Sequence, residues 1–178
     1  MSKTVVIYKS KYGSTKKYAE WIAKATSSNL FEKSQISIQK LKDYDTIVYG
    51  GGLYVSGIIG FSIIKDNYDK LKDKKIIVFS VGASPAREEA LEEVKKKNFT
   101  DDMRSNINYF HLRGGLDYKS MNVKDRFLMY LLNKMIKKKK PEELDEDSKG
   151  LLATYGKTVD FTSEKYIQPI VDCIQSLQ

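Results

Sequence analysis

Residues 5–25 read VVIYKSKYGSTKKYAEWIAKA, and this stretch decides the fold of the chain. The β-branched and aromatic run at residues 5–8 predicts a short buried strand. Apolar residues then recur at helical spacing in Tyr18, Trp21, Ile22 and Ala25, which predicts a helix that packs one face on a core. A buried strand that passes through a short turn into a helix indicates an α/β fold.

Similar signals repeat along the rest of the chain. Apolar runs predict further strands at residues 36–38, 47–49, 76–79 and 107–112, and helical spacing predicts helices at residues 61–71, 85–96, 123–136 and 163–177. Ser84, Asn122 and Thr162 are expected to cap the last three helices, and Pro169 to bend the last one. Residues 137–159 show no clear period and are expected to wrap the surface. At 178 residues, we expect one domain over residues 1–178.

The counts of cysteine and histidine exclude several kinds of site. Cys173 is the only cysteine and His111 the only histidine, so neither an internal disulfide nor a multi-histidine metal site can form. With one histidine, a Ser-His-Asp triad is also disfavoured. We expect structural roles for His111 and Cys173. The sequence predicts no metal site and identifies no catalytic residue.

The formal net charge is +8, which favours anionic partners. No secretory signal pattern opens the chain, so a cytoplasmic location is expected. Residues 46–64 carry no charge over a length close to a membrane span, but their five glycines favour a strand, a loop and a helix start. No nucleic-acid recognition motif is visible, and nucleic acid is not an expected partner.

The loop after the first strand is rich in hydroxyl groups. It consists of Ser10, Lys11, Tyr12, Gly13, Ser14 and Thr15 and ends at a helix N-terminus. Hydroxyls and backbone N–H groups at the positive end of a helix dipole suit a bound phosphate. A turn that merely caps the helix is the alternative, and it stays open. Gly-Lys-Ser/Thr is absent, which argues against a P-loop.

Small residues also follow the later strands, at the sheet edge where α/β proteins bind ligands. The third strand leads into Gly50, Gly51, Gly52, Leu53, Tyr54, Val55, Ser56 and Gly57, and the fourth into Ser80, Val81, Gly82, Ala83 and Ser84. Glycines let a flat ligand approach the backbone, and Tyr54 offers an aromatic face. The alternative for the third-strand loop is a flexible turn.

Taken together, these loops resemble those of the flavodoxin family, over nearly the whole chain. The family's phosphate loop follows Ser/Thr-x-Ser/Thr-Gly-x-Thr, and residues 10–15 depart from it only at Tyr12. The resemblance implies a three-layer α/β/α sandwich with a five-stranded parallel sheet in the order 2-1-3-4-5. It also implies that residues 10–15 bind the phosphate of FMN and that residues 51–57 and 80–84 flank its ring, with Tyr54 stacked on it.

Residues 50–57, 114–118 and 125–129 further resemble the menaquinone-dependent protoporphyrinogen oxidases. That branch implies an oxidoreductase that takes a porphyrin substrate and a quinone. The alternative is a flavodoxin-like electron-transfer protein with a redox protein as its partner and no small-molecule substrate. A module that has lost the flavin is a third possibility. Residues 51–56 lack the arginine that the branch often places beside the flavin.

The predicted helix at residues 123–136 lies in the most basic part of the chain. Residues 119–140 hold eight basic residues and one acidic residue, together with many apolar ones. Such a helix can lie on an anionic membrane, which would make the protein membrane-peripheral through residues 123–140. The alternative, which we favour from the sequence, is a helix that packs its apolar face on the core.

Overall fold

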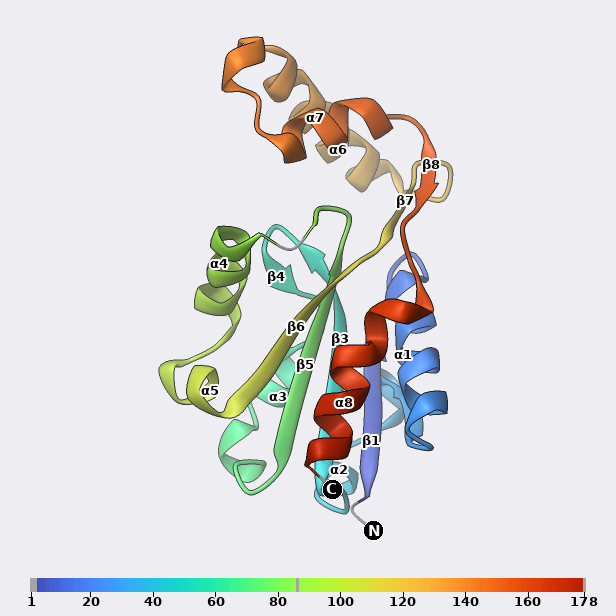
Figure 1. The fold of residues 1–178 in the computed structure, drawn as a ribbon, viewed down its shortest axis with the longest axis vertical. Coiled ribbons are helices and arrows are strands. Elements are labelled where there is room, and N and C mark those ends of the chain that lie inside the picture. Colours follow the sequence, from blue (N-terminus) through green and yellow to red (C-terminus); the bar gives the residue numbers. More distant parts are fainter. Residues whose placement is uncertain (1–2, 86, 178) are drawn as a thin grey trace.

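The computed structural model describes residues 3–85 and 87–177, and a parallel sheet lies at its centre. Its strands are β1 (Thr4–Lys9), β2 (Asn29–Glu32), β3 (Thr46–Tyr54), β5 (Lys75–Gly82) and β6 (Ile107–Arg113). They lie in the order β2-β1-β3-β5-β6, and the short β4 (Gly57–Ile58) pairs antiparallel with β3 (Figure 1). The predicted order of five parallel strands is therefore confirmed.

Helices cover both faces of this sheet. On one face lie α1 (Ser14–Ala25) and α8 (Gln168–Ser176), and on the other α2 (Ile38–Leu41), α3 (Ser62–Lys65), α4 (Glu88–Asn98) and α5 (Asp101–Asn106). Successive strand residues point to opposite faces. Val6 accordingly joins the cluster under α1 and α8, whereas Val5 and Ile7 join the cluster on the other side. The three-layer prediction is confirmed.

The boundaries of two predicted strands are wrong. The second strand is at Asn29–Glu32 rather than residues 36–38; Ile36 follows the 3-10 helix η1 (Lys33–Gln35), and Ser37 caps α2. The third strand does not end at Tyr49. It continues to Tyr54, because β5 pairs with all three glycines, β1 pairs with the first two, and β4 pairs with Leu53 and Tyr54.

Three predicted helices also differ from the structure. Residues 61–71 form only α3 and the 3-10 helix η2 (Tyr68–Lys70). The helix after β5 begins at Glu88 with Arg87 as its N-cap, not with Ser84, because contacts to the Ala83 and Ser84 carbonyls hold that loop open. At the C-terminus, η4 (Glu164–Ile167) precedes α8, which begins only at Gln168. Pro169 therefore lies in the first turn of α8, where a proline does not bend the helix.

Residues 115–160 form an extension that we call the arm. It contains β7 (Gly115–Asp117), α6 (Val123–Lys137), η3 (Pro141–Glu143), α7 (Glu146–Thr154) and β8 (Thr158–Asp160). The antiparallel pair β7 and β8 connects the arm to the sheet, and α7 packs against α6. Figure 1 shows the arm beyond the carboxyl ends of the strands. The expectation that residues 137–159 wrap the surface is thus replaced by an ordered unit.

The uncharged run at residues 46–64 forms β3, β4 and the start of α3. In the part of the chain that the structure describes, no helix combines the length and the hydropathy that crossing a membrane requires.

Candidate functional site

A cavity lies at the carboxyl ends of β1, β3, β5 and β6, where the arm meets the sheet. Glycines at the strand ends form part of its wall. A Cβ on Gly82 would stand 3.1 Å from the His111 ring, and one on Gly114 would stand 2.7 Å from the Val81 side chain. A side chain at either position would collide with these neighbours, so glycine is needed for the wall to pack as it does.

The 10–15 loop supplies one rim of this cavity. Gly13 adopts a left-handed conformation with φ 95°, and its N–H donates to Ser10 Oγ at 3.0 Å. This turn directs the chain into α1 at Ser14, and the buried Thr15 faces the cavity. Because the first turn of a helix has N–H groups without intrahelical partners, the rim carries hydrogen-bond donors and the positive end of a dipole.

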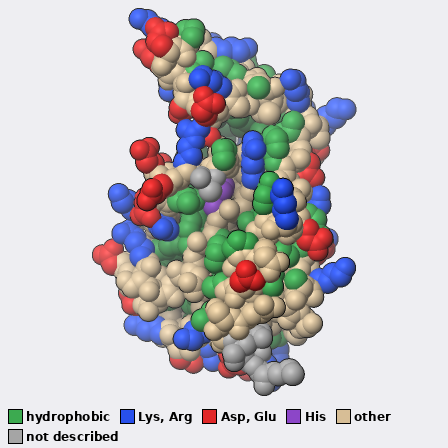
Figure 2. All heavy atoms as spheres, in the orientation of Figure 1, with side chains coloured by type: hydrophobic (Ala, Val, Ile, Leu, Met, Phe, Trp, Pro, Cys, Tyr) green, Lys and Arg blue, Asp and Glu red, His purple; other side chains and the backbone are tan. Residues whose placement is uncertain are grey.

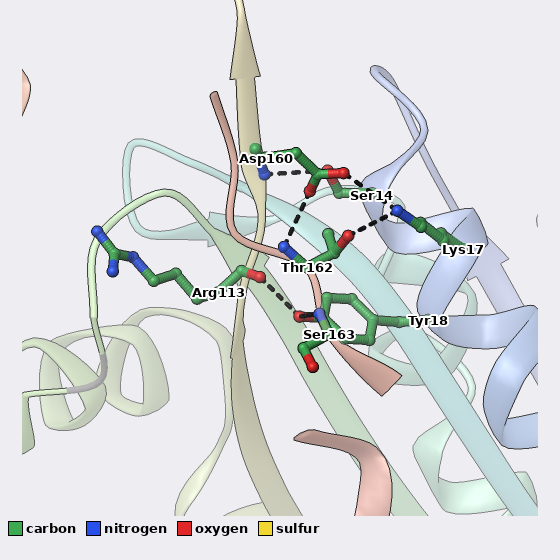
Figure 3. Close-up of polar contacts among 8 residues, drawn as sticks. Ser14, Lys17, Tyr18, Arg113, Asp160, Thr162 and Ser163 are labelled. Carbon is green, nitrogen blue, oxygen red and sulfur yellow. Dashed lines mark hydrogen bonds and ion pairs between the residues drawn. The ribbon is translucent and has the colours of Figure 1, made fainter. Parts of the chain in front are cut away.

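Polar contacts fix the start of α1 against both ends of the arm (Figure 3). Lys17 Nζ donates to Thr162 Oγ1 at 2.9 Å and lies 3.1 Å from Asp160 Oδ2. Tyr18 Oη donates to the Arg113 carbonyl at 2.7 Å, and the Gly115 N–H donates to Ser14 Oγ at 3.1 Å. Thr162 therefore serves as the acceptor for Lys17 rather than as the predicted helix cap. The loop's geometry is set by residues distant in sequence.

The third-strand loop divides between the cavity and α4. Gly52, Leu53 and Tyr54 line the cavity. Val55 and Ser56 have positive φ angles of 48° and 60° and form the two-residue turn between β3 and β4. Ser56 Oγ donates to Glu93 Oε1 at 2.7 Å, which holds this turn on α4 and away from the cavity.

The fourth-strand loop divides in a similar way. Val81, Gly82 and Ala83 line the cavity, whereas Ser80 is fully buried on the face of the sheet that carries Tyr109. Ser80 Oγ lies 2.6 Å from Tyr109 Oη and 2.9 Å from His111 Nδ1. Ser80 points to that face because β5 continues to Gly82, and side chains alternate between the two faces along a strand.

His111 supports the same loop. Its Nε2 lies 3.0 Å from the Ser84 carbonyl, which can only accept a hydrogen bond, so Nε2 carries the proton and Nδ1 accepts from Ser80. Burial lowers the pKa of His111 below its usual value, which favours this neutral form. Figure 2 shows the single histidine, in purple, in the hollow between the arm and the sheet.

The arm supplies a wall whose residues are absent from the predicted set of cofactor-binding residues. Asp125, Leu128 and Met129 of α6 line the cavity, together with Gly114, Gly115, Leu116, Met121 and Ile59. Asp125 is 6% exposed; its Oδ2 accepts from Tyr12 Oη and lies 2.6 Å from Lys11 Nζ. Burial acts to raise the pKa of Asp125, but the bonds from Lys11 and Tyr12 outweigh it and lower that pKa. One feature of the sequence could have indicated a special role for Asp125: it is the only acidic residue in a strongly basic helix.

The cavity therefore gathers part of the predicted site. Its lining includes the following predicted residues: Ser10, Lys11, Tyr12, Ser14, Thr15, Gly52, Leu53, Tyr54, Val81, Gly82 and Ala83. The remaining ones lie outside the lining: Gly13, Gly51, Val55, Ser56, Gly57, Ser80 and Ser84. Within residues 3–85 and 87–177, no group of three or more His, Cys, Asp or Glu side chains is arranged to hold a metal ion.

Comparison with known proteins gives one family. A family model described as "Flavodoxin domain" matches residues 5–143. A putative flavoprotein from Bacteroides eggerthii is 15% identical, with 74% of this chain and 98% of that one covered and a TM-score of 0.47. No curated protein sequence matches the chain.

Two further solved structures are similar at the same level. A WrbA-like flavodoxin from Agrobacterium tumefaciens is 20% identical, covering 70% of this chain and 88% of that one, with a TM-score of 0.44. A flavoprotein from Lactobacillus acidophilus, solved in complex with FMN, is 19% identical, covering 64% and 93%, with a TM-score of 0.41.

Proposed function

The chain belongs to the flavodoxin domain family, and we propose on this basis that it binds FMN in the cavity and works as an FMN-dependent oxidoreductase. The observation that carries the proposal is the meeting of the 10–15 loop with two small-residue loops around one cavity. FMN, when bound, supplies the electron acceptor and donor. The protein supplies its binding, its orientation and the exclusion of water.

The chemistry of the lining fits FMN. The phosphate would be held by the hydroxyls of Ser10, Ser14 and Thr15 and by the N–H groups at the start of α1. Ser14 Oγ accepts from Gly115, which leaves its hydrogen free to donate to an anion. The flavin ring would lie against Leu53 and Tyr54 on one side and against residues 81–83 on the other.

We favour a small-molecule oxidoreductase of the quinone-dependent protoporphyrinogen oxidase type as the finer function. The arm supports this choice, because α6 closes one side of the cavity and gives it an apolar wall in Leu128 and Met129. A flat, largely apolar substrate such as a porphyrin or a quinone suits such a wall.

An electron-transfer protein without a small-molecule substrate is the second candidate. This candidate is favoured by the bonding of three titratable side chains in the cavity, because Lys11 and Tyr12 both bond to Asp125. Each member of this trio is bonded to another member, and electron transfer to a redox protein needs no proton donor or acceptor in the cavity. Steady-state oxidation of protoporphyrinogen with a menaquinone analogue as acceptor separates the two candidates.

Titration of the purified protein with FMN and with riboflavin tests cofactor binding. We expect yellow colour and a clear preference for FMN. Thr15→Val is expected to weaken FMN binding about tenfold and to leave riboflavin binding unchanged, because it removes one hydroxyl at the phosphate. Thr46→Val is a matched control in the buried part of β3. A colourless protein that binds neither compound would contradict the proposal and favour a module without flavin.

A further inference from the structure

The outward face of α6 is the largest group of exposed apolar side chains in the described part of the chain. Seven of the eleven large exposed apolar residues are on this helix. One of them, Leu128, lines the cavity, and the six on the outward face are Val123, Phe127, Tyr130, Leu131, Leu132 and Met135. Val123 is 82% exposed and Phe127 58%. A helix that packs on a core buries such residues, so the favoured sequence interpretation of α6 is wrong for this face.

The inward face of α6 is, by contrast, narrow and partly polar. Its buried residues are Asp125, Asn133 and Ile136. Asp125 is held by Lys11 and Tyr12 of the 10–15 loop, and the Asn122 side chain caps the first turn by accepting from the Asp125 N–H at 2.9 Å. These contacts fix how the helix is rotated. The exposure of the apolar stripe is therefore a built feature of the arm and not a result of a loosely attached helix.

Basic side chains accompany the apolar stripe. Lys124, Lys134 and Lys138 are exposed and fall, by helical spacing, on the same side as Phe127 and Leu131. The lysine run at residues 137–140 extends it at the C-terminal end. The one acidic residue of residues 119–140 is Asp125, which points inward. The outward face thus combines apolar and positive groups without a negative one.

We propose that this face of α6 docks on an anionic lipid bilayer, with the apolar stripe in the acyl boundary and the lysines among the headgroups. An exposed helix with this combination is typical of helices that lie in a membrane interface. Burial of the apolar stripe favours a bilayer, and the lysines favour one with anionic headgroups. A second copy of the chain is disfavoured as the occupant, because a symmetric contact would place two strongly basic faces against each other. The acidic residues 142–147 lie in η3, at the N-cap of α7 and in the first turn of α7, all of which follow α6 in the chain.

Docking of this face would also bring the cavity close to the membrane. Leu128 and Met129 line the cavity from the same helix, so docking would place the cavity about one helix diameter, roughly 10 Å, from the lipid surface. An apolar substrate held in the membrane would then have a short path to the site. The docking itself does not depend on FMN, and either proposal can fail without the other.

Flotation with vesicles tests the docking, using the full chain and measuring bound FMN in parallel. We expect binding to phosphatidylcholine vesicles that contain phosphatidylglycerol, weaker binding at high salt, and little binding to phosphatidylcholine alone. Phe127→Ser combined with Leu131→Ser removes the apolar part, and Lys134→Glu combined with Lys138→Glu reverses the charged part. Each pair is expected to weaken partitioning about tenfold or more. Neither pair involves a residue that lines the cavity.

Lys24→Glu combined with Lys42→Glu is the matched control, since both lysines are exposed on other elements and the change in net charge is the same. It is expected to bind vesicles like the unchanged protein. Absence of binding to anionic vesicles at low salt would overturn the proposal. So would a loss of vesicle binding in the control variant as large as the loss in the two α6 variants. A dimer that Phe127→Ser and Leu131→Ser dissociate would assign the face to a second copy instead.

Discussion

Lys11 and Asp125 form an ion pair with Nζ 2.6 Å from Oδ2, and this pair joins the 10–15 loop to α6 of the arm. Lys11 Nζ also lies 5.2 Å from the centre of the Tyr54 ring. The bond to Asp125 raises the pKa of Lys11, so the lysine stays charged. One buried carboxylate thus connects the proposed phosphate loop, the proposed ring-binding tyrosine and the helix that closes the cavity.

Asp125→Asn is expected to lower the free energy of unfolding at pH 7 by about 1–2 kcal/mol, because it removes the charge that Lys11 and Tyr12 bind. Urea unfolding measures this loss. Asp43→Asn is the control, since Asp43 forms an exposed pair with Lys40, and a change of about 0–0.5 kcal/mol is expected there.

The same comparison has a pH signature. The folded-state pKa of Asp125 is below the ordinary 3.8, so its stabilisation is present above that pH and is lost as the pH falls through the folded-state value. The difference between the unchanged protein and Asp125→Asn should therefore shrink below about pH 3.8. A difference that persists in acid would mean that shape rather than charge sets the effect.

Gly13→Ala is expected to destabilise the protein by about 1–2 kcal/mol, because an alanine must adopt the left-handed conformation at φ 95°. A Cβ at this position has no neighbour within 4 Å, so the cost comes from the backbone alone. Gly150→Ala in α7 also has open space and is expected to stabilise by about 0.5–1 kcal/mol. Thermal unfolding compares the two, and similar effects at both glycines would contradict the explanation.

Thr46→Val is expected to raise the free energy of unfolding by up to about 1 kcal/mol. Thr46 is fully buried, and its Oγ1 has no hydrogen-bond partner among the described residues. Replacing an unpaired buried hydroxyl by a methyl group of similar size removes a desolvation cost. A destabilised Thr46→Val protein in urea unfolding would show that the hydroxyl is bonded in solution.

His111 predicts a loss of stability toward mildly acidic pH. Its folded-state pKa is below the ordinary 6.5, so the unfolded chain binds a proton at higher pH than the folded one. The contribution of His111 is then fully present above about pH 6.5 and decreases as the pH falls toward the folded-state pKa.

His111→Gln removes this titration. We expect the melting temperature of the unchanged protein to fall between about pH 6.5 and pH 5 more steeply than that of the variant. Parallel slopes would show that other groups cause the pH dependence. Ser80→Ala supplies a second check, because it removes the donor to Nδ1 and leaves the histidine to titrate.

The sequence by itself determined the alternation of strands and helices and the small-residue loops that follow the strands. Those features depend on local periodicity and on glycine and hydroxyl residues within a few positions, which a single chain displays directly. The order of the strands was implied instead by the resemblance to the flavodoxin family. Asn122 as the cap of α6 is one such feature. The second strand and the start of α4 were misplaced, because pairing partners and loop contacts outweigh local propensity there.

Only the tertiary structure decided which predicted site residues face the cavity and what closes it. Ser80 turns away because the pairing of β5 with β6 continues past it, and Ser56 turns away because α4 binds it. Asp125 enters the site because the arm brings α6 back over the 10–15 loop, and that rotation leaves Phe127 in solvent. These outcomes depend on contacts between residues far apart in the chain, which no local pattern encodes.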